Sequence, residues 1–384
     1  MSDRAERPPA SGEHETAGEH ETARADPREQ LPMPVRPTAM HMLRHPDRRT
    51  TWAGAGVLRF EEPLGGGDPA KVGRIVEERF AELHRCFPLV GARLRGTTWH
   101  PGATNPVAFS DANRSVAPEH VRAFDLSTEA PLRLFADSHG SWITVVPHHA
   151  AIDGASVVGM FKILCGQAPG APERTRALAR RSVPAWSALT RLAWPADPVA
   201  PSPEQPEHDS FAHVQLPAIG KDAATRLPEA LAHALMEHNA RAGVPLKKIG
   251  LSISVVEVDE GEAVASYRRV DVRAGSDLRP AVEAALRSPE EPWEILHAPR
   301  ALRLLAPLAG RLSDTLLLSN FGRVQLGGAR SLEIYPVARG RSAVAFGAVR
   351  VAGAESTLTI RARSLSNQDA KSVLARALEH LAGS

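Results

Sequence analysis

The 384-residue sequence lacks the features that mark several distinctive classes of protein. It has two cysteines, Cys86 and Cys165, and no Cys-x-x-Cys pair, which argues against a disulfide scaffold and against a thiolate zinc site. Its longest apolar stretches, such as residues 143–146, are far shorter than the roughly 20 residues of a membrane-spanning helix. The N-terminus contains no apolar signal core. We therefore expect a cytoplasmic protein with no membrane span and no bound metal.

An excess of charge of one sign is also missing. The 46 basic and 44 acidic residues give a net charge of +2, and the lysines and arginines are scattered along the chain. This distribution argues against nucleic acid as a partner. The content of 43% hydrophobic and 23% charged residues is that of an ordinary globular protein. Because 384 residues exceed the size at which a single hydrophobic core stops growing, we expect two packed units.

Changes in composition along the chain predict four segments. Residues 1–30 are rich in Glu, Arg, Pro and His and almost free of apolar residues, which predicts a disordered tail. Residues 31–165 show strand and helix patterns and form the first α/β subdomain. Residues 166–209 contain eight prolines and are interpreted as a crossover linker. Residues 210–384 alternate strands and helices again and form the second α/β subdomain.

The clearest local pattern lies late in the first subdomain. Residues 142–146 form a largely β-branched run that predicts a buried strand, which ends at Pro147. Beyond Gly154, apolar residues recur at helical spacing, namely Val157, Val158, Phe161 and Leu164. The segment His-His-Ala-Ala-Ile-Asp-Gly, residues 148–154, therefore connects a core strand to a helix. On such a connection a side chain can be held rigidly and still reach a cleft.

His149 of this segment is the candidate general base. An imidazole has a reference pKa of about 6.5, so it is mostly unprotonated at neutral pH and can accept a proton. Two adjacent histidines at a strand end are also consistent with simple packing, and Asp153 by itself is consistent with a helix cap. The offset of Asp153 and Gly154 from the histidines, together with the flanking strand and helix, favours the catalytic interpretation.

The spacing His-His-x-x-x-Asp-Gly resembles the active-site motif of the chloramphenicol acetyltransferase-like superfamily. This superfamily includes nonribosomal-peptide condensation domains and bacterial and plant-type acyltransferases. Other stretches resemble the family in the same order, namely residues 87–94, 131–134 and 319–322. The resemblance extends over roughly residues 32–380. It implies an α/β fold in which two subdomains form a pseudo-dimer, with a tunnel at their interface.

The same resemblance implies a reaction and a donor. An acyl group would pass from coenzyme A or a carrier-protein phosphopantetheine to a hydroxyl or amine. His149 would be the general base, attack on the thioester would be direct, and no cofactor would be bound permanently. No adenylation or carrier segment is recognisable in the sequence, so a carrier-borne donor would arrive on a separate protein.

The resemblance also assigns supporting roles around His149 and its neighbour His148. Asp153 would hold the loop by pairing with an arginine, and Arg93 is our candidate for that partner. Gly154 would leave room for the substrate arm. Ser319 and Asn320, reaching across from the second subdomain, would hold the oxyanion or orient the loop.

Three functions remain open at this stage. The first is an acyltransferase that acts on an alcohol in secondary-metabolite or lipid biosynthesis. The second is a condensation enzyme that forms an amide between carrier-bound partners. The third is a non-catalytic docking protein that keeps the fold. We expect a monomer, and the sequence does not indicate the acyl chain or the acceptor.

Overall fold

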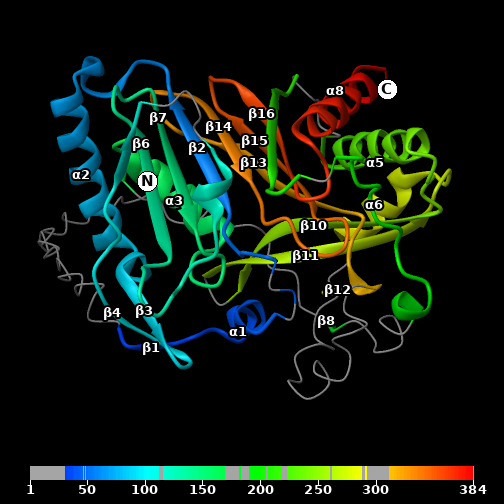
Figure 1. Cartoon of the computed structure of the whole chain (residues 1–384), viewed down its shortest axis with the longest axis horizontal. Coiled ribbons are helices and arrows are strands. Elements are labelled where there is room, and N and C mark those ends of the chain that lie inside the picture. The colour runs from blue at the N-terminus through cyan, green and yellow to red at the C-terminus, as the bar shows by residue number, and fades with distance from the viewer. Residues whose placement is uncertain are drawn as a thin grey trace, which may run out of the picture.

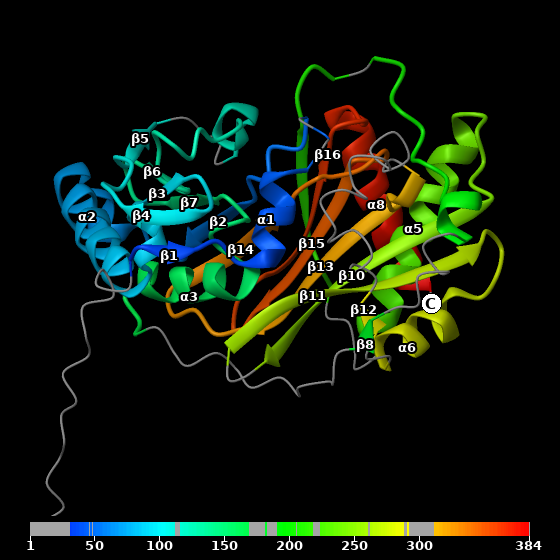
Figure 2. The same cartoon turned by 90° about the horizontal axis from the view of Figure 1, so that it is seen from below.

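The structure is a computed structural model, and the chain forms two α/β lobes that lie side by side (Figures 1 and 2). The described residues are 31–45, 47, 49–111, 116–168, 181–182, 190–204, 206–217, 223–259, 262–287, 290–291 and 311–383. The tail predicted for residues 1–30 and parts of the predicted linker lie outside these ranges. Each lobe carries helices packed on a mixed sheet, which confirms the predicted α/β class with two subdomains. Among the described helices, none is long and apolar enough to cross a membrane.

The first lobe, here called the N-lobe, is built on a five-stranded sheet with the order β14-β2-β7-β6-β5. Its strands are β2 (Ala55–Phe60), β5 (Ala108–Ser110), β6 (Leu132–Asp137), β7 (Trp142–Pro147) and β14 (Ala329–Tyr335). Helices α2 (Pro69–Cys86) and α3 (Gly154–Leu164) share a hydrophobic core with this sheet. Beside it lie helix α1 (Pro37–Leu43) and a small sheet of β1 (Met33–Pro34), β4 (Thr98–Pro101) and β3 (Ala92–Arg95).

Strand β7 is buried along its whole length, as the apolar run in the sequence predicts. Ile143 and Val145 pack in the cluster beneath α2 and α3, whereas Trp142 and Val146 belong to a second cluster on the opposite side. A strand covered on both faces has no need of polar positions, which explains the absence of apolar and polar alternation. The catalytic candidate, His149, follows directly on this buried strand.

Helix α2 begins with an oxygen cap followed by proline, a pattern typical of helix starts. The side chain of Asp68 accepts hydrogen bonds from the first turn, and Pro69 occupies the first helical position. One face of the helix is buried through Val72, Val76, Phe80 and Leu83. The helix therefore covers the N-lobe sheet from the outer side, next to α3 (Figure 1).

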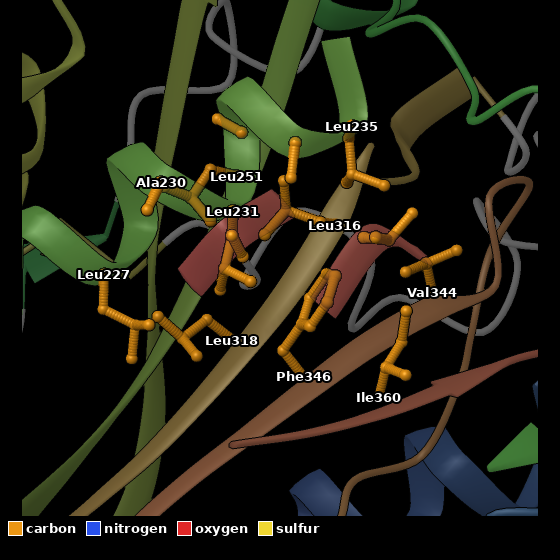
Figure 3. Packing of buried hydrophobic residues seen from close by; sticks show 14 of the residues in the cluster. Leu227, Ala230, Leu231, Leu235, Leu251, Leu316, Leu318, Val344, Phe346 and Ile360 are labelled. Atoms are coloured by element: carbon orange, nitrogen blue, oxygen red, sulfur yellow. The ribbon is translucent and has the colours of Figure 1, made fainter. Parts of the chain in front are cut away.

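The second lobe, here called the C-lobe, contains a six-stranded sheet with the order β11-β10-β13-β15-β16-β9. Its strands are β9 (Ser210–Gln215), β10 (Lys248–Asp259), β11 (Glu262–Arg273), β13 (Leu316–Val324), β15 (Val344–Val351) and β16 (Ser356–Ala362). Helices α5 (Ala223–Arg241), α6 (Leu278–Arg287) and α8 (Asn367–Gly383) pack on it. Figure 3 shows Leu231 and Leu235 of α5 above Leu318 and Phe346 of the sheet. Strands β8 (Arg181–Ser182) and β12 (Glu290–Glu291) form a separate parallel pair.

Strand β14 corrects the predicted boundary between the subdomains. Residues 210–384 were expected to form the second subdomain alone, but β14 pairs antiparallel with β2 and forms an edge of the N-lobe sheet. The carbonyl oxygens of Leu332 and Ile334 accept hydrogen bonds from the Thr357 and Thr359 hydroxyls of β16. One strand is thus bonded to both lobes (Figures 1 and 2). Its pairing joins residues far apart in the chain, which local sequence patterns do not report.

The end of the predicted linker, residues 166–209, is packed against the C-lobe. Val199 is buried in the C-lobe core. One carboxylate oxygen of Asp197 accepts hydrogen bonds from the backbone N–H groups of Lys247 and Lys248, at 2.6 and 2.8 Å. In its described part, this segment is therefore a fixed element of the lobe rather than a flexible connection.

Candidate active site

The loop between β7 and α3 is a tight turn tied to the chain that leads into β2. The His148 carbonyl oxygen accepts hydrogen bonds from the N–H groups of Ala151 and Ile152, at 3.0 and 3.1 Å. The N–H of His149 donates to the carbonyl of Trp52 at 2.8 Å. The backbone of His149 is therefore fixed both from within the turn and from the neighbouring strand extension.

Asp153 caps helix α3. Its carboxylate accepts a hydrogen bond of 2.8 Å from the N–H of Ser156, and its backbone has the extended conformation typical of a cap. The cap orients the helix that follows the turn. Asp153 is therefore a structural residue, as both interpretations of the sequence expected.

The arginine near Asp153 is Arg36, whose Nη1 lies 3.9 Å from a carboxylate oxygen. The prediction that Arg93 holds this position is wrong. Arg93 lies on β3 of the small sheet, where its Nε donates to the carbonyl of Thr128 and its Nη1 to the carbonyl of Ala92. The pairing depends on how the chain before α1 reaches α3, which the spacing of residues does not show.

Loss of this cap should destabilise the protein moderately. We expect Asp153→Ala to lower the free energy of unfolding by about 1 kcal/mol, because the N–H of Ser156 loses its acceptor. Asp153→Asn keeps an oxygen at that position and should cost clearly less. Urea unfolding of the two variants tests this. Equal losses would show that the charge pair with Arg36, rather than the cap, stabilises the loop.

The ring of His149 has a defined tautomer. Its Nδ1 lies 3.3 Å from the carbonyl oxygen of Ile152, which only accepts hydrogen bonds, so Nδ1 carries the proton. The lone pair is then on Nε2. Burial lowers the pKa of His149 below its usual 6.5 and outweighs the Ile152 carbonyl and Asp153, which raise it, while the charge of Arg339 lowers it further. At neutral pH the ring is a free base.

His149 lines a pocket between the two lobes that encloses about 820 Å³ of space, part of it open to solvent. The N-lobe contributes Trp52, Gly54, Ala55, Pro147, His149, Ile152, Asp153, Gly154, Val157, Ile334 and Tyr335. The C-lobe and the loop after β14 contribute Ser254, Tyr267, Leu317, Ser319, Asn320, Phe321, Pro336, Val337 and Arg339. The predicted interface site is thus a pocket, and its continuation as a tunnel open on two sides stays a prediction.

Four of the predicted supporting residues share this pocket with His149: Asp153, Gly154, Ser319 and Asn320. A Cβ atom on Gly154 would lie 3.1 Å from the ring of Phe321, so the glycine makes room for that ring as well as for a ligand. The amide oxygen of Asn320 accepts a hydrogen bond from the N–H of Gly322 at 3.0 Å, which fixes its orientation.

His148 lies outside this set of pocket residues in the described chain. It is buried with its ring edge-on to Phe124, at a centroid distance of 5.5 Å. Its Nδ1 accepts a hydrogen bond from the N–H of Ala150 at 3.2 Å, so the ring is neutral. Burial, aided by the charges of His149 and Arg133, lowers the pKa of His148 to about 3. His148 is therefore a positioning residue for the loop rather than a second base.

This buried neutral histidine should make the protein sensitive to acid. The unfolded chain protonates His148 near pH 6.5, whereas the folded chain does so only near pH 3, so stability falls as the pH drops between these values. The expected loss is about 1.4 kcal/mol per pH unit from this residue. Urea unfolding at pH 7, 6, 5 and 4 measures it, with His148→Asn as the control that keeps an acceptor but does not titrate. The same slope in that variant would contradict the assignment.

Several pocket residues gave no signal in the sequence. The chain has two tyrosines, Tyr267 and Tyr335, and both line the pocket. Trp52 lines it in an unusual backbone conformation, with φ of 53°. Arg339 adds a charged side chain. These residues come from separate strands and loops, so only the fold brings them together. The described residues contain no group of three or more His, Cys, Asp or Glu side chains placed to hold a metal ion.

No known protein-family profile matches the sequence, and no curated protein sequence does either. Solved structures do resemble the chain. The starter condensation domain of rhizomide synthetase, in a complex with C8-CoA and Leu-SNAC, has a TM-score of 0.55 at 13% identity, covering 93% of this chain and 95% of that one. The first condensation domain of the CDA synthetase has a TM-score of 0.54 at 15% identity, covering 90% and 94%.

The epimerization domain from the third module of tyrocidine synthetase B has a TM-score of 0.52 at 15% identity, covering 92% of this chain and 95% of that one. The similarity in all three comparisons extends over both lobes rather than one. The chain therefore has the same fold as these condensation and epimerization domains.

Proposed function

We propose that this protein is an acyltransferase that moves an acyl group from a thioester to a hydroxyl or amine, with His149 as the general base. The observation that carries the proposal is the state of His149. Its Nδ1 proton is bound to the Ile152 carbonyl, its Nε2 is left as the base, and the residue lines a mainly apolar pocket between two lobes. A base in a sheltered cleft where two substrates can meet is what direct acyl transfer requires.

The reaction follows from these groups. The Nε2 of His149 accepts the proton of the acceptor O–H or N–H while the acceptor oxygen or nitrogen attacks the thioester carbonyl. Ser319 and Asn320, which line the same pocket, are the candidate donors to the resulting oxyanion. The intermediate collapses to the ester or amide, and the departing sulfur takes the proton from His149. The base is restored, and no acyl-enzyme is needed.

The two cysteines are poor alternatives as nucleophiles. Neither Cys86 nor Cys165 is among the residues that line the pocket. Burial raises the pKa of Cys165 to about 11, so it is a thiol rather than a thiolate at neutral pH. This supports direct attack over a covalent acyl-enzyme.

The donor is an acyl-coenzyme A or an acyl carrier protein, and the setting is secondary-metabolite or lipid biosynthesis. The structure solved with C8-CoA supports a thioester as the first choice of donor to test. Ester formation is the principal proposal, and amide formation by a free-standing condensation enzyme is the second candidate.

Product analysis tests the proposal directly. The protein is incubated with octanoyl-coenzyme A, or with an octanoyl carrier protein, in the presence of an alcohol or an amine acceptor. Release of free thiol is followed by colorimetry, and the product is identified by mass spectrometry. An ester supports the principal proposal and an amide the second. Absence of acceptor-dependent thiol release with every donor would favour a non-catalytic docking protein.

A further inference from the structure

Arg339 places a positive charge in this mainly apolar pocket. It lies in the loop between β14 and β15 and lines the pocket with His149. Its guanidinium carbon lies 4.6 Å from the centroid of the Tyr267 ring, and its Nη2 lies 3.7 Å from a carboxylate oxygen of Asp314. Only 11% of the side chain is exposed. The charge is therefore held in one place by a cation-π contact and an ion pair.

Arg339 belongs to a cluster of basic and acidic side chains. Asp314 also pairs with Arg269, and Asp271 pairs with three cations. Among the described residues the cluster comprises the basic Arg191, Lys248, Arg269 and Arg339 and the acidic Asp271 and Asp314. All six side chains are largely buried, so their charges are only weakly screened. An anion in the pocket would offset part of the cost of burying the Arg339 charge.

A second residue of the pocket, Trp52, has a hydrogen-bond donor that a ligand oxygen would satisfy. Trp52 lines the pocket and is 6% exposed, and its indole Nε1 is buried without a hydrogen-bond acceptor among the described residues. A buried N–H without an acceptor costs free energy, which a ligand oxygen would recover. The acidic residue of the pocket, Asp153, already caps α3. The groups left for an anionic ligand are therefore the guanidinium of Arg339 and the indole N–H of Trp52.

We propose that the pocket binds a carboxylate of the substrate through Arg339, with Trp52 as a second donor. The acyl donor or the acceptor then carries a carboxylate in addition to the group that reacts. The assignment of the carboxylate to an acyl donor or an acceptor rests on the proposed acyl transfer. The binding of a carboxylate in the pocket does not depend on it.

Calorimetric titration with octanoate and octanamide tests the binding. The two probes have the same length, but at pH 7.5 only octanoate is charged. A charge-assisted hydrogen bond is worth about 1.5–3 kcal/mol, so octanoate should bind about 10- to 150-fold more tightly than octanamide. In Arg339→Gln the preference for octanoate should fall to about threefold or less, because the charge-assisted hydrogen bond is lost. Equal affinities in the wild type, or an undiminished preference in a folded Arg339→Gln protein, would overturn the proposal.

Two further variants keep this result interpretable. Arg339→Lys retains the charge but not the planar guanidinium, so it should keep part of the preference; thermal melts show whether each variant is folded. His149→Ala should retain the full preference for octanoate. The preference in His149→Ala separates the two proposals, because a failure of catalysis leaves the binding result standing.

Turnover then assigns the carboxylate to one substrate. With a neutral acceptor, the ratio of kcat/KM for an ω-carboxyacyl-coenzyme A to that for its methyl ester reports on the donor. With octanoyl-coenzyme A, the ratio for leucine over leucinamide reports on the acceptor. If one ratio exceeds tenfold and falls towards one in Arg339→Gln, the substrate on which it reports carries the carboxylate. The tenfold threshold corresponds to about one charge-assisted hydrogen bond. If neither ratio responds to Arg339, the substrate assignment is overturned even if octanoate binds.

Discussion

Replacing His149 by alanine should lower kcat/KM for acyl transfer by about 10²- to 10⁴-fold, the usual contribution of a positioned general base. The loss should appear mainly in kcat, because the ring acts on the proton that moves in the transition state. Steady-state rates of thiol release with a saturating donor measure it. Added imidazole should restore part of the rate to His149→Ala, since the variant leaves a space beside the acceptor.

His208→Ala is the matched control, because His208 is exposed and is not among the pocket residues. Its rate should equal that of the wild type. The pH dependence gives a further check. Because burial lowers the pKa of His149 below its usual 6.5, the rate should decline on the acid side at a lower pH than a free imidazole would give. A His149→Ala protein that retains the wild-type rate would show that base catalysis by this residue is not the mechanism.

Replacing Gly347 by alanine should have the largest effect on stability, about 3 kcal/mol or more. Gly347 lies on β15, where β14 crosses towards the N-lobe. A Cβ atom there would overlap the carbonyl oxygen of Ile334 and come within 2.8 Å of the Thr359 hydroxyl. These two groups are hydrogen-bonded to each other at the junction of the lobes. The added methyl group has no room unless the backbone of one strand moves.

The same substitution should also reduce activity, because Gly347 stands next to Ser319 in the register of β13 and β15. Thermal and urea unfolding measure the loss of stability. Gly73→Ala is the control, since Gly73 lies in α2 with open space where a Cβ would be, and the change there should stabilise by about 0.5–1 kcal/mol. A Gly347→Ala protein as stable as the wild type would mean that β14 and β15 are packed less closely at Gly347 than the structure shows.

Most of the local structure around the site was determined by the sequence. The β-branched run before Pro147 predicted β7, and Asp68 followed by Pro69 is a local sequence typical of the helix start found at α2. The spacing of residues 148–154 predicted a turn between a strand and a helix, with Asp153 able to cap the helix. These features depend on backbone preferences and on periodicity within about 20 residues, so a single sequence contains them.

Only the tertiary structure decided which distant residues complete the site. It placed β14 in the N-lobe sheet, put Arg36 rather than Arg93 beside Asp153, and turned His148 away from the pocket. It also brought both tyrosines and Arg339 to the same pocket as His149. Such contacts arise from strand pairing and packing between segments far apart in the chain. Many side chains meet the volume and pairing requirements of a given position equally well. A local sequence pattern therefore predicts neither which strands pair nor which residue reaches the pocket.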